Sequence, residues 1–116
     1  MRLCHDNDLP EGDSRGFDPW SQGRDTVLVV RQGDRVYAYL DACPHHNTPM
    51  AWRKDRYLNA AGDRIVCAAH GALFDIPTGR CTLGPCLGDH LTPVALEHHP
   101  NGELHITDHR PSETQA

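Results

Sequence analysis

Two short segments of the sequence each combine a cysteine with a nearby histidine: Cys43-Pro44-His45 and Cys67-Ala-Ala-His70. This close spacing lets a single loop direct one thiolate and one imidazole toward the same small group. Together the two segments offer two sulfur and two nitrogen ligands, the donor types that bind transition metals in proteins. The repeated chemistry favours a metal centre over unrelated surface and core residues.

Two kinds of metal centre accept this donor set. Zinc takes two cysteines and two histidines in tetrahedral geometry, but zinc modules usually pair like with like, and a RING-like spacing would need a cysteine at Thr48. A [2Fe–2S] cluster with two histidines on one iron explains the mixed pairs, because each loop gives its cysteine to one iron and its histidine to the other. The cluster is therefore the favoured interpretation, and a zinc-stabilised interaction module is the alternative from a different class.

The remaining sequence predicts strands and turns as the scaffold. Nine prolines and ten glycines indicate many turns, hence short strands and an antiparallel all-β fold. Short helical turns are expected only within 9–17 and 47–52. Three hairpins are predicted from alternating or continuous apolar runs around turn residues: 26–40, turning at Gly33-Asp34; 56–58 with 64–67, turning at 60–63; and 92–98 with 103–107, turning at Asn101-Gly102.

Composition narrows the class of protein. A chain of 116 residues corresponds to one domain, and its net charge of −5, from 16 acidic and 11 basic residues, argues against nucleic acid as a partner. The sequence has neither an apolar run long enough for a membrane span nor a secretory signal at its start, so we expect a cytoplasmic protein without a membrane partner. Five cysteines in such a protein indicate metal or redox use, not a disulfide framework.

At this point the sequence resembles a known family. "CPHHNTPMAW" (43–52) followed by "CAAHGALFDIPTGRCTLGPCLG" (67–88) closely resembles the Rieske iron–sulfur domain in its ferredoxin-like, low-potential form. The resemblance rests on the C-x-H…C-x₂-H motif, on His-Gly-x-x-Phe (70–74), on the Thr78-Gly79 turn and on the Gly84-Pro85 loop.

The resemblance implies a single Rieske domain over 1–116. Its fold is expected to be an antiparallel β-sandwich or barrel with base strands at about 1–40 and 88–110, into which a small cluster-binding subdomain at about 41–87 is inserted. One [2Fe–2S] cluster per chain is implied. Its ligands would be Cys43 and Cys67 on the buried iron, and His45 and His70 on the outer iron.

The sequence departs from the high-potential Rieske proteins of respiratory chains. Their additional disulfide would join positions near Met50 and Ala69, and the hydroxyl groups that hydrogen-bond their cluster would fall at Ala72 and Phe74. None of these four side chains supplies the missing group. Fewer donors to the reduced cluster predict a potential at the low end of the Rieske range, around −150 mV.

Several other residues invite a role. Cys81 and Cys86 flank the Gly-Pro loop, where they either form a local disulfide or pack as thiols. His46 is adjacent to the predicted ligand, but its offset is wrong for ligation, so it is expected to be a bystander. The histidines at 98–99 and 105 are expected on solvated strand faces.

The predicted function is one-electron transfer. No G-x-G-x-x-G follows a predicted strand, and no iron site of the 2-His-1-carboxylate kind is evident, so the chain is expected to be an electron-transfer component and not a catalyst on its own. The resemblance implies a shuttle between a flavin-dependent reductase and a terminal oxygenase. The alternative is a small electron-transfer subunit of a larger oxidoreductase, such as a nitrite reductase or an oxygenase.

Overall fold

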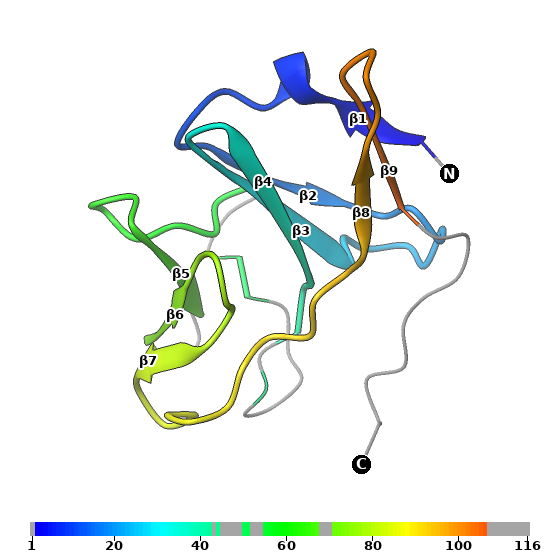
Figure 1. Ribbon diagram of the computed structural model, residues 1–116. Coiled ribbons are helices and arrows are strands. Elements are labelled where there is room, and N and C mark those ends of the chain that lie inside the picture. The colour runs from blue at the N-terminus through cyan, green and yellow to red at the C-terminus, as the bar shows by residue number, and fades with distance from the viewer. Residues whose placement is uncertain (1, 43, 45–49, 52–54, 68–70, 107–116) are drawn as a thin grey trace.

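The computed structural model describes residues 2–42, 44, 50–51, 55–67 and 71–106. Within these ranges nine strands form three antiparallel sheets, in the orders β1-β9-β8, β2-β3-β4 and β5-β6-β7 (Figure 1). The predicted all-β class is confirmed. The elements are β1 (Arg2–His5), the 3-10 turn η1 (Asp6–Asp8), β2 (Ser14–Phe17), β3 (Val27–Gln32), β4 (Arg35–Leu40), β5 (Arg64–Cys67), β6 (Ala72–Asp75), β7 (Cys81–Leu83), β8 (Leu96–His98) and β9 (Glu103–Ile106).

The β2-β3-β4 sheet is covered on both faces, as the sequence of β3 requires. Successive side chains of a strand point to opposite faces, so a continuous apolar run has two buried faces. Val27 and Val29 pack in one core with Leu9 and Ile106, near the β1-β9-β8 sheet. Leu28 and Val30 pack in a second core, which takes many of its residues from the β5-β6-β7 sheet and the segments around it. The central sheet thus joins the two smaller sheets through two separate cores.

Two of the three predicted hairpins are confirmed. β3 and β4 pair up to Gln32 and Arg35, and the turn between them has Gly33 at a φ of +63°. β8 and β9 form the hairpin that turns at 101–102, where Gly102 has a φ of +92°. Its first strand begins at Leu96 and not at 92, because residues 92–94 hydrogen-bond to β4 instead. Both turns need a residue that tolerates positive φ, which explains why local sequence was sufficient to find them. Position 107 of the third hairpin lies outside the described residues.

The second predicted hairpin is only partly correct. Arg64–Cys67 is strand β5, but its regular partner is β6, whereas the 56–58 segment contributes an isolated bridge between Leu58 and Ile65. The cause lies outside the segment. Asp55 has a φ of +65°, and its backbone oxygen and side chain accept hydrogen bonds from β2, which draws the start of this segment toward a different sheet.

The helical turn predicted within 9–17 is also misplaced. A 3-10 turn occurs just before that window, at Asp6–Asp8, while Ser14–Phe17 is strand β2. His5 caps the turn, because its Nδ1 accepts a hydrogen bond from the backbone N–H of Asn7. Of the second window, 47–52, the structure describes only Met50 and Ala51. Among the described residues no helix is long and apolar enough to cross a membrane.

Candidate functional site

The first half of the predicted ligand motif follows directly after β4. Asp41 is buried (3% exposed), and its backbone N–H donates to the carbonyl oxygen of Thr26 on the neighbouring chain segment. Its Oδ1 accepts a 2.8 Å hydrogen bond from the backbone N–H of Met50. This bond joins the two ends of the segment 42–49, which contains Cys43 and His45. Both of these predicted ligands lie outside the described residues.

The second carboxylate oxygen of Asp41 is bound by Tyr57. The Tyr57 hydroxyl donates to Oδ2 across 2.8 Å, and the ring is completely buried. Burial raises the pKa of Asp41, and the hydrogen bonds from Met50 and Tyr57 partly offset that increase. Burial also raises the pKa of the Tyr57 phenol far above its ordinary value, and the neighbouring Asp41 charge adds to the effect. The pair therefore places a carboxyl group and a neutral phenol next to Met50, where the first ligand segment ends.

Tyr57 is held in place by hydrogen bonds of its own segment with Ser14 of β2. Its backbone N–H donates to Oγ of Ser14 (3.3 Å), and the Ser14 hydroxyl donates to the carbonyl oxygen of Asp55 (2.7 Å). A Cβ at Gly16 would come within 2.6 Å of the Tyr57 hydroxyl and within 2.6 Å of a carboxylate oxygen of Asp25. Glycine at position 16 is therefore needed for this close approach.

The second half of the motif begins at the end of β5. Cys67 is fully buried, pairs in register with Ala72 of β6, and accepts a 2.7 Å hydrogen bond at its carbonyl oxygen from the N–H of Gly71. Residues 68–70 thus connect two strands whose facing ends are fixed. His70 lies in this segment, outside the described residues.

A third loop lies against the start of β6. It runs from β7 to Asp89, whose carbonyl oxygen accepts a 2.8 Å hydrogen bond from the backbone N–H of Cys81. Gly84 of this loop has a φ of +111°, and a Cβ there would lie 2.8 Å from Cα of Ala72. The loop backbone is therefore in direct contact with the start of β6.

The ends of all three loops share one buried core. This core contains Met50 after the first segment, Cys67 and Ala72 on either side of the second, and Cys81 and Cys86 in the third. Of the four predicted ligands the structure describes only Cys67, so it tests neither the ligand set nor the bystander role of His46. It does show that the chain brings the boundaries of the two Cys/His segments, far apart in sequence, into a single apolar environment.

Sequence reasoning missed the role of Asp41. The signal was present, because an aspartate directly after a buried strand and two positions before the cysteine of "CPHH" is an unusual place for an unpaired charge. Its partners could not be read from the sequence, since Tyr57 lies 16 positions away in a segment that was assigned to a different pairing.

Four described histidines outside the motif, at positions 5, 98, 99 and 105, lie beside carboxylates near the β1-β9-β8 sheet. Nε2 of His98, an exposed side chain, lies 2.9 Å from Oδ2 of Asp6. The rings of His99 and His105 stack with centroids 4.0 Å apart, and His105 contacts Glu103. Within the described ranges no group of three or more such side chains has the geometry to hold a metal ion.

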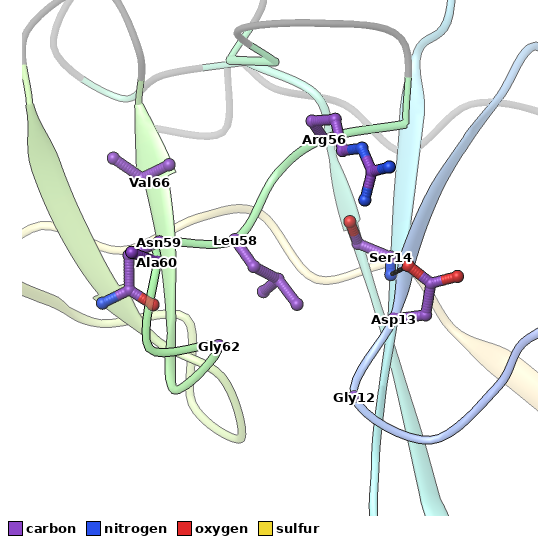
Figure 2. A pocket seen from close by; sticks show the side chains of 9 residues that line it. All are labelled: Gly12, Asp13, Ser14, Arg56, Leu58, Asn59, Ala60, Gly62 and Val66. Atoms are coloured by element: carbon purple, nitrogen blue, oxygen red, sulfur yellow. Dashed lines mark hydrogen bonds between the residues drawn. The ribbon is translucent and has the colours of Figure 1, made fainter.

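A surface hollow lies on the other side of β5. It has a volume of about 510 Å³ and lies between the Gly12–Ser14 segment and the chain from Arg56 to Gly62 (Figure 2). Val66 lines it, whereas the adjacent Cys67 is buried in the core, as alternation along a strand requires. The hollow is therefore separated from the predicted ligand face by the strand itself.

Known proteins are similar to this chain over most of its length. A family model described as the Rieske [2Fe-2S] domain matches residues 1–100. Ferredoxin CarAc of Metapseudomonas resinovorans is 31% identical over 86 residues, which cover 74% of this chain and 74% of that protein. Apoptosis-inducing factor 3 of Homo sapiens is 32% identical over 77 residues, which cover 66% of this chain. The chain spans only 11% of the length of that much larger relative.

A solved structure has the same fold. It is a chain from a complex of reduced oxygenase and oxidized ferredoxin in carbazole 1,9a-dioxygenase, which superposes with a TM-score of 0.72 at 26% identity. The superposition covers 97% of this chain and 96% of that chain. The similarity therefore extends over the whole domain and is not limited to the Cys/His motif.

Proposed function

This chain belongs to the Rieske [2Fe–2S] domain family, and we propose that it is a one-electron carrier that passes electrons from a flavin-dependent reductase to a terminal oxygenase. The observation that carries the proposal is the family match over residues 1–100, together with a ferredoxin relative of which the chain covers 74%. The complex of an oxygenase with a ferredoxin supports the choice of partner.

The cluster is proposed to be held by Cys43 and Cys67 on one iron and by His45 and His70 on the other. When bound, a Rieske cluster gains and loses a single electron, and its histidine ligands give it a higher potential than all-cysteine clusters have. The donor set of the sequence fits this group, because it supplies two thiolates and two imidazoles. The buried position of Cys67 in an apolar core also fits, since a thiolate there needs a positive partner such as iron.

The chain's own residues supply the support for this site. We propose that Asp41 holds the first ligand segment closed through its hydrogen bond to Met50, and that the third loop covers the second segment through the contact of Gly84 with Ala72. We further propose that the cluster-binding subdomain comprises about 41–87, inserted between base strands at about 1–40 and 88–110. Contacts that support the segments around a metal site orient the ligands and change the affinity of the site for the metal.

The surface charge is consistent with a protein partner. A net charge of −5 favours docking on a basic face of a reductase or an oxygenase and disfavours nucleic acid. A cytoplasmic location is part of the proposal, and it rests on the sequence expectation given above.

The proposal is tested on the purified full chain. We expect iron and acid-labile sulfide in equal amounts, an EPR signal from the reduced form, and electron delivery to an oxygenase when a reductase is added. Cys67→Ser and His70→Ala should each abolish the signal, whereas His46→Ala and Cys4→Ser should retain it. Zinc in place of iron would contradict the cluster and favour the interaction module.

A further inference from the structure

Cys81 and Cys86 form a thiol pair at the two ends of the third loop. Their Sγ atoms lie 3.1 Å apart, about 1 Å more than the length of a disulfide bond. The thiol of Cys86 donates toward the sulfur of Cys81, and the thiol of Cys81 donates to the carbonyl oxygen of Leu83 across 3.3 Å. The two sulfurs are therefore in contact and oriented toward each other without being bonded.

The backbone around the pair is already closed. The N–H of Cys81 donates to the carbonyl oxygen of Asp89, and the N–H of Asp89 donates to the carbonyl oxygen of Cys86. The N–H of Leu87 donates to the carbonyl oxygen of Gly84. These bonds return the chain to its starting point, so a covalent link between the two sulfurs needs only a small approach of the side chains. The base of the loop keeps its position.

The two cysteines are buried beside exposed residues of the same loop. Both sulfur-bearing residues are 1–2% exposed, whereas Leu83 and Leu87 between and beside them are 58% and 68% exposed. Buried groups beneath the surface become accessible when the chain around them opens locally. A small reagent can therefore reach the sulfurs when the loop opens, while a bulky one is hindered.

The loop is adjacent to the second ligand segment. Gly84, between the two cysteines, lies against Ala72, and Ala72 is the register partner of Cys67. A bond between the two sulfurs would fix the loop against this strand pair. Cys4, by comparison, is buried away from this core and has no cysteine neighbour among the described residues.

From these contacts we propose that Cys81 and Cys86 are a modification site, a dithiol that reacts reversibly with a low-molecular-weight disulfide to form a bond closing the third loop. In the first step one cysteine thiolate attacks the small disulfide, which forms a mixed disulfide and releases one thiol. In the second step the other cysteine attacks the mixed disulfide and releases the second thiol. The protein thus loses two electrons and two protons, and the small disulfide is reduced to two thiols.

The test uses the full chain as purified, with its cluster. The protein is equilibrated in buffers of increasing glutathione disulfide to glutathione ratio, then denatured, alkylated with N-ethylmaleimide and digested with trypsin. The tryptic peptide that begins after Arg80 has Cys81 and Cys86 as its only cysteines, while Cys43 and Cys67 lie in other peptides. Mass spectrometry therefore reads the pair without interference from the proposed cluster ligands.

We expect this peptide to lose both maleimide adducts together as the ratio rises, and to regain both after reduction with dithiothreitol. Cys86→Ser should instead leave one reactive thiol or one glutathione adduct, whereas Cys4→Ser should behave like the parent protein. Retention of both adducts at every ratio would overturn the proposal, as would a glutathione adduct on a single cysteine of the parent. Absorbance of the equilibrated samples, recorded before they are denatured, reports the cluster separately, so failure of the proposed function is distinguishable.

Discussion

The Tyr57 hydroxyl donates a 2.8 Å hydrogen bond to Oδ2 of Asp41, and both side chains are buried. The other oxygen of the same carboxylate accepts from the N–H of Met50 across 2.8 Å. A single buried aspartate thus connects β4, the far end of the first ligand segment and the chain that leads to β5. A buried carboxylate is stable only with such partners, so its hydrogen bonds and its location depend on each other.

Removing this carboxylate should destabilise the fold. Asp41→Ala leaves the N–H of Met50 and the hydroxyl of Tyr57 buried and unpaired, at a cost of about 2–4 kcal/mol in the free energy of unfolding. Asp41→Asn retains an acceptor for Met50 and a polar neighbour for Tyr57, so we expect a smaller loss, about 1 kcal/mol. Urea denaturation measures both.

The exposed Asp34 provides the control for this experiment. Asp34→Ala removes a carboxylate of the same size from the surface turn between β3 and β4, and we expect a change of about 0.5 kcal/mol or less. If Asp41→Ala unfolds at the same urea concentration as Asp34→Ala, the hydrogen bonds of Asp41 contribute nothing to stability. Iron content after prolonged dialysis gives a second readout, and Asp41→Ala should lose iron faster than the control.

The contact between the third loop and β6 is tested by a pair of glycines. Gly84→Ala introduces a Cβ 2.8 Å from Cα of Ala72, whereas at Gly88 the same substitution meets no atom within 4 Å. Both positions have positive φ, +111° and +96°, so both variants carry the backbone strain of about 1 kcal/mol. The additional loss in Gly84→Ala measures the close approach, which we expect to add about 1–3 kcal/mol. Equal melting temperatures would mean that the loop moves away from β6 without cost.

The alkaline limit of stability should depend on Tyr39. Its hydroxyl donates to the carbonyl oxygen of Ile76 across 2.6 Å, and burial, with smaller effects from Asp75 and Tyr37, raises the pKa of the phenol to about 12. A phenol that holds its proton more tightly in the folded state contributes stability that is complete below pH 10 and is lost as the pH rises through 12. The slope in that window is at most about 1.4 kcal/mol per pH unit.

Tyr39→Phe should flatten this alkaline decline. The variant loses one hydrogen bond, about 1 kcal/mol at neutral pH. It also lacks the phenol at position 39 that ionises more readily in the unfolded state than in the folded state. Tyr57 contributes the same kind of decline in both proteins, because its phenol pKa is raised as well. Denaturation curves between pH 9 and 12, with the half-buried Tyr37→Phe as control, measure the difference. Parallel curves for all three proteins would rule out the contribution of Tyr39.

The midpoint potential is expected at the low end of the Rieske range, around −150 mV. Ala72 and Phe74 are both fully buried and have no hydroxyl, and the two buried tyrosine hydroxyls, on Tyr39 and Tyr57, are already engaged with Ile76 and Asp41. Ala72→Ser should therefore raise the potential, since an added donor favours the reduced, more negative cluster. Ala38→Ser, in the other core, should leave it unchanged. A parent potential above zero in a redox titration would contradict the argument.

What the sequence determined by itself is local. The Cys/His spacing identified the donor set and the family, the Gly33-Asp34 and Asn101-Gly102 turns placed two hairpins, and the apolar run at 27–31 indicated a strand. Each of these signals depends on neighbours a few positions apart, where turn chemistry and strand alternation determine the conformation.

What only the tertiary structure decided is long-range. It paired Asp41 with Tyr57, joined the 56–58 segment to two different sheets, and brought the backbone of Gly84 against Ala72. These relationships depend on how three sheets pack around two cores, and no short window of sequence contains both partners of such a packing contact. The sequence therefore determined which residues could hold a cluster, and packing decided which residues hold those segments in place.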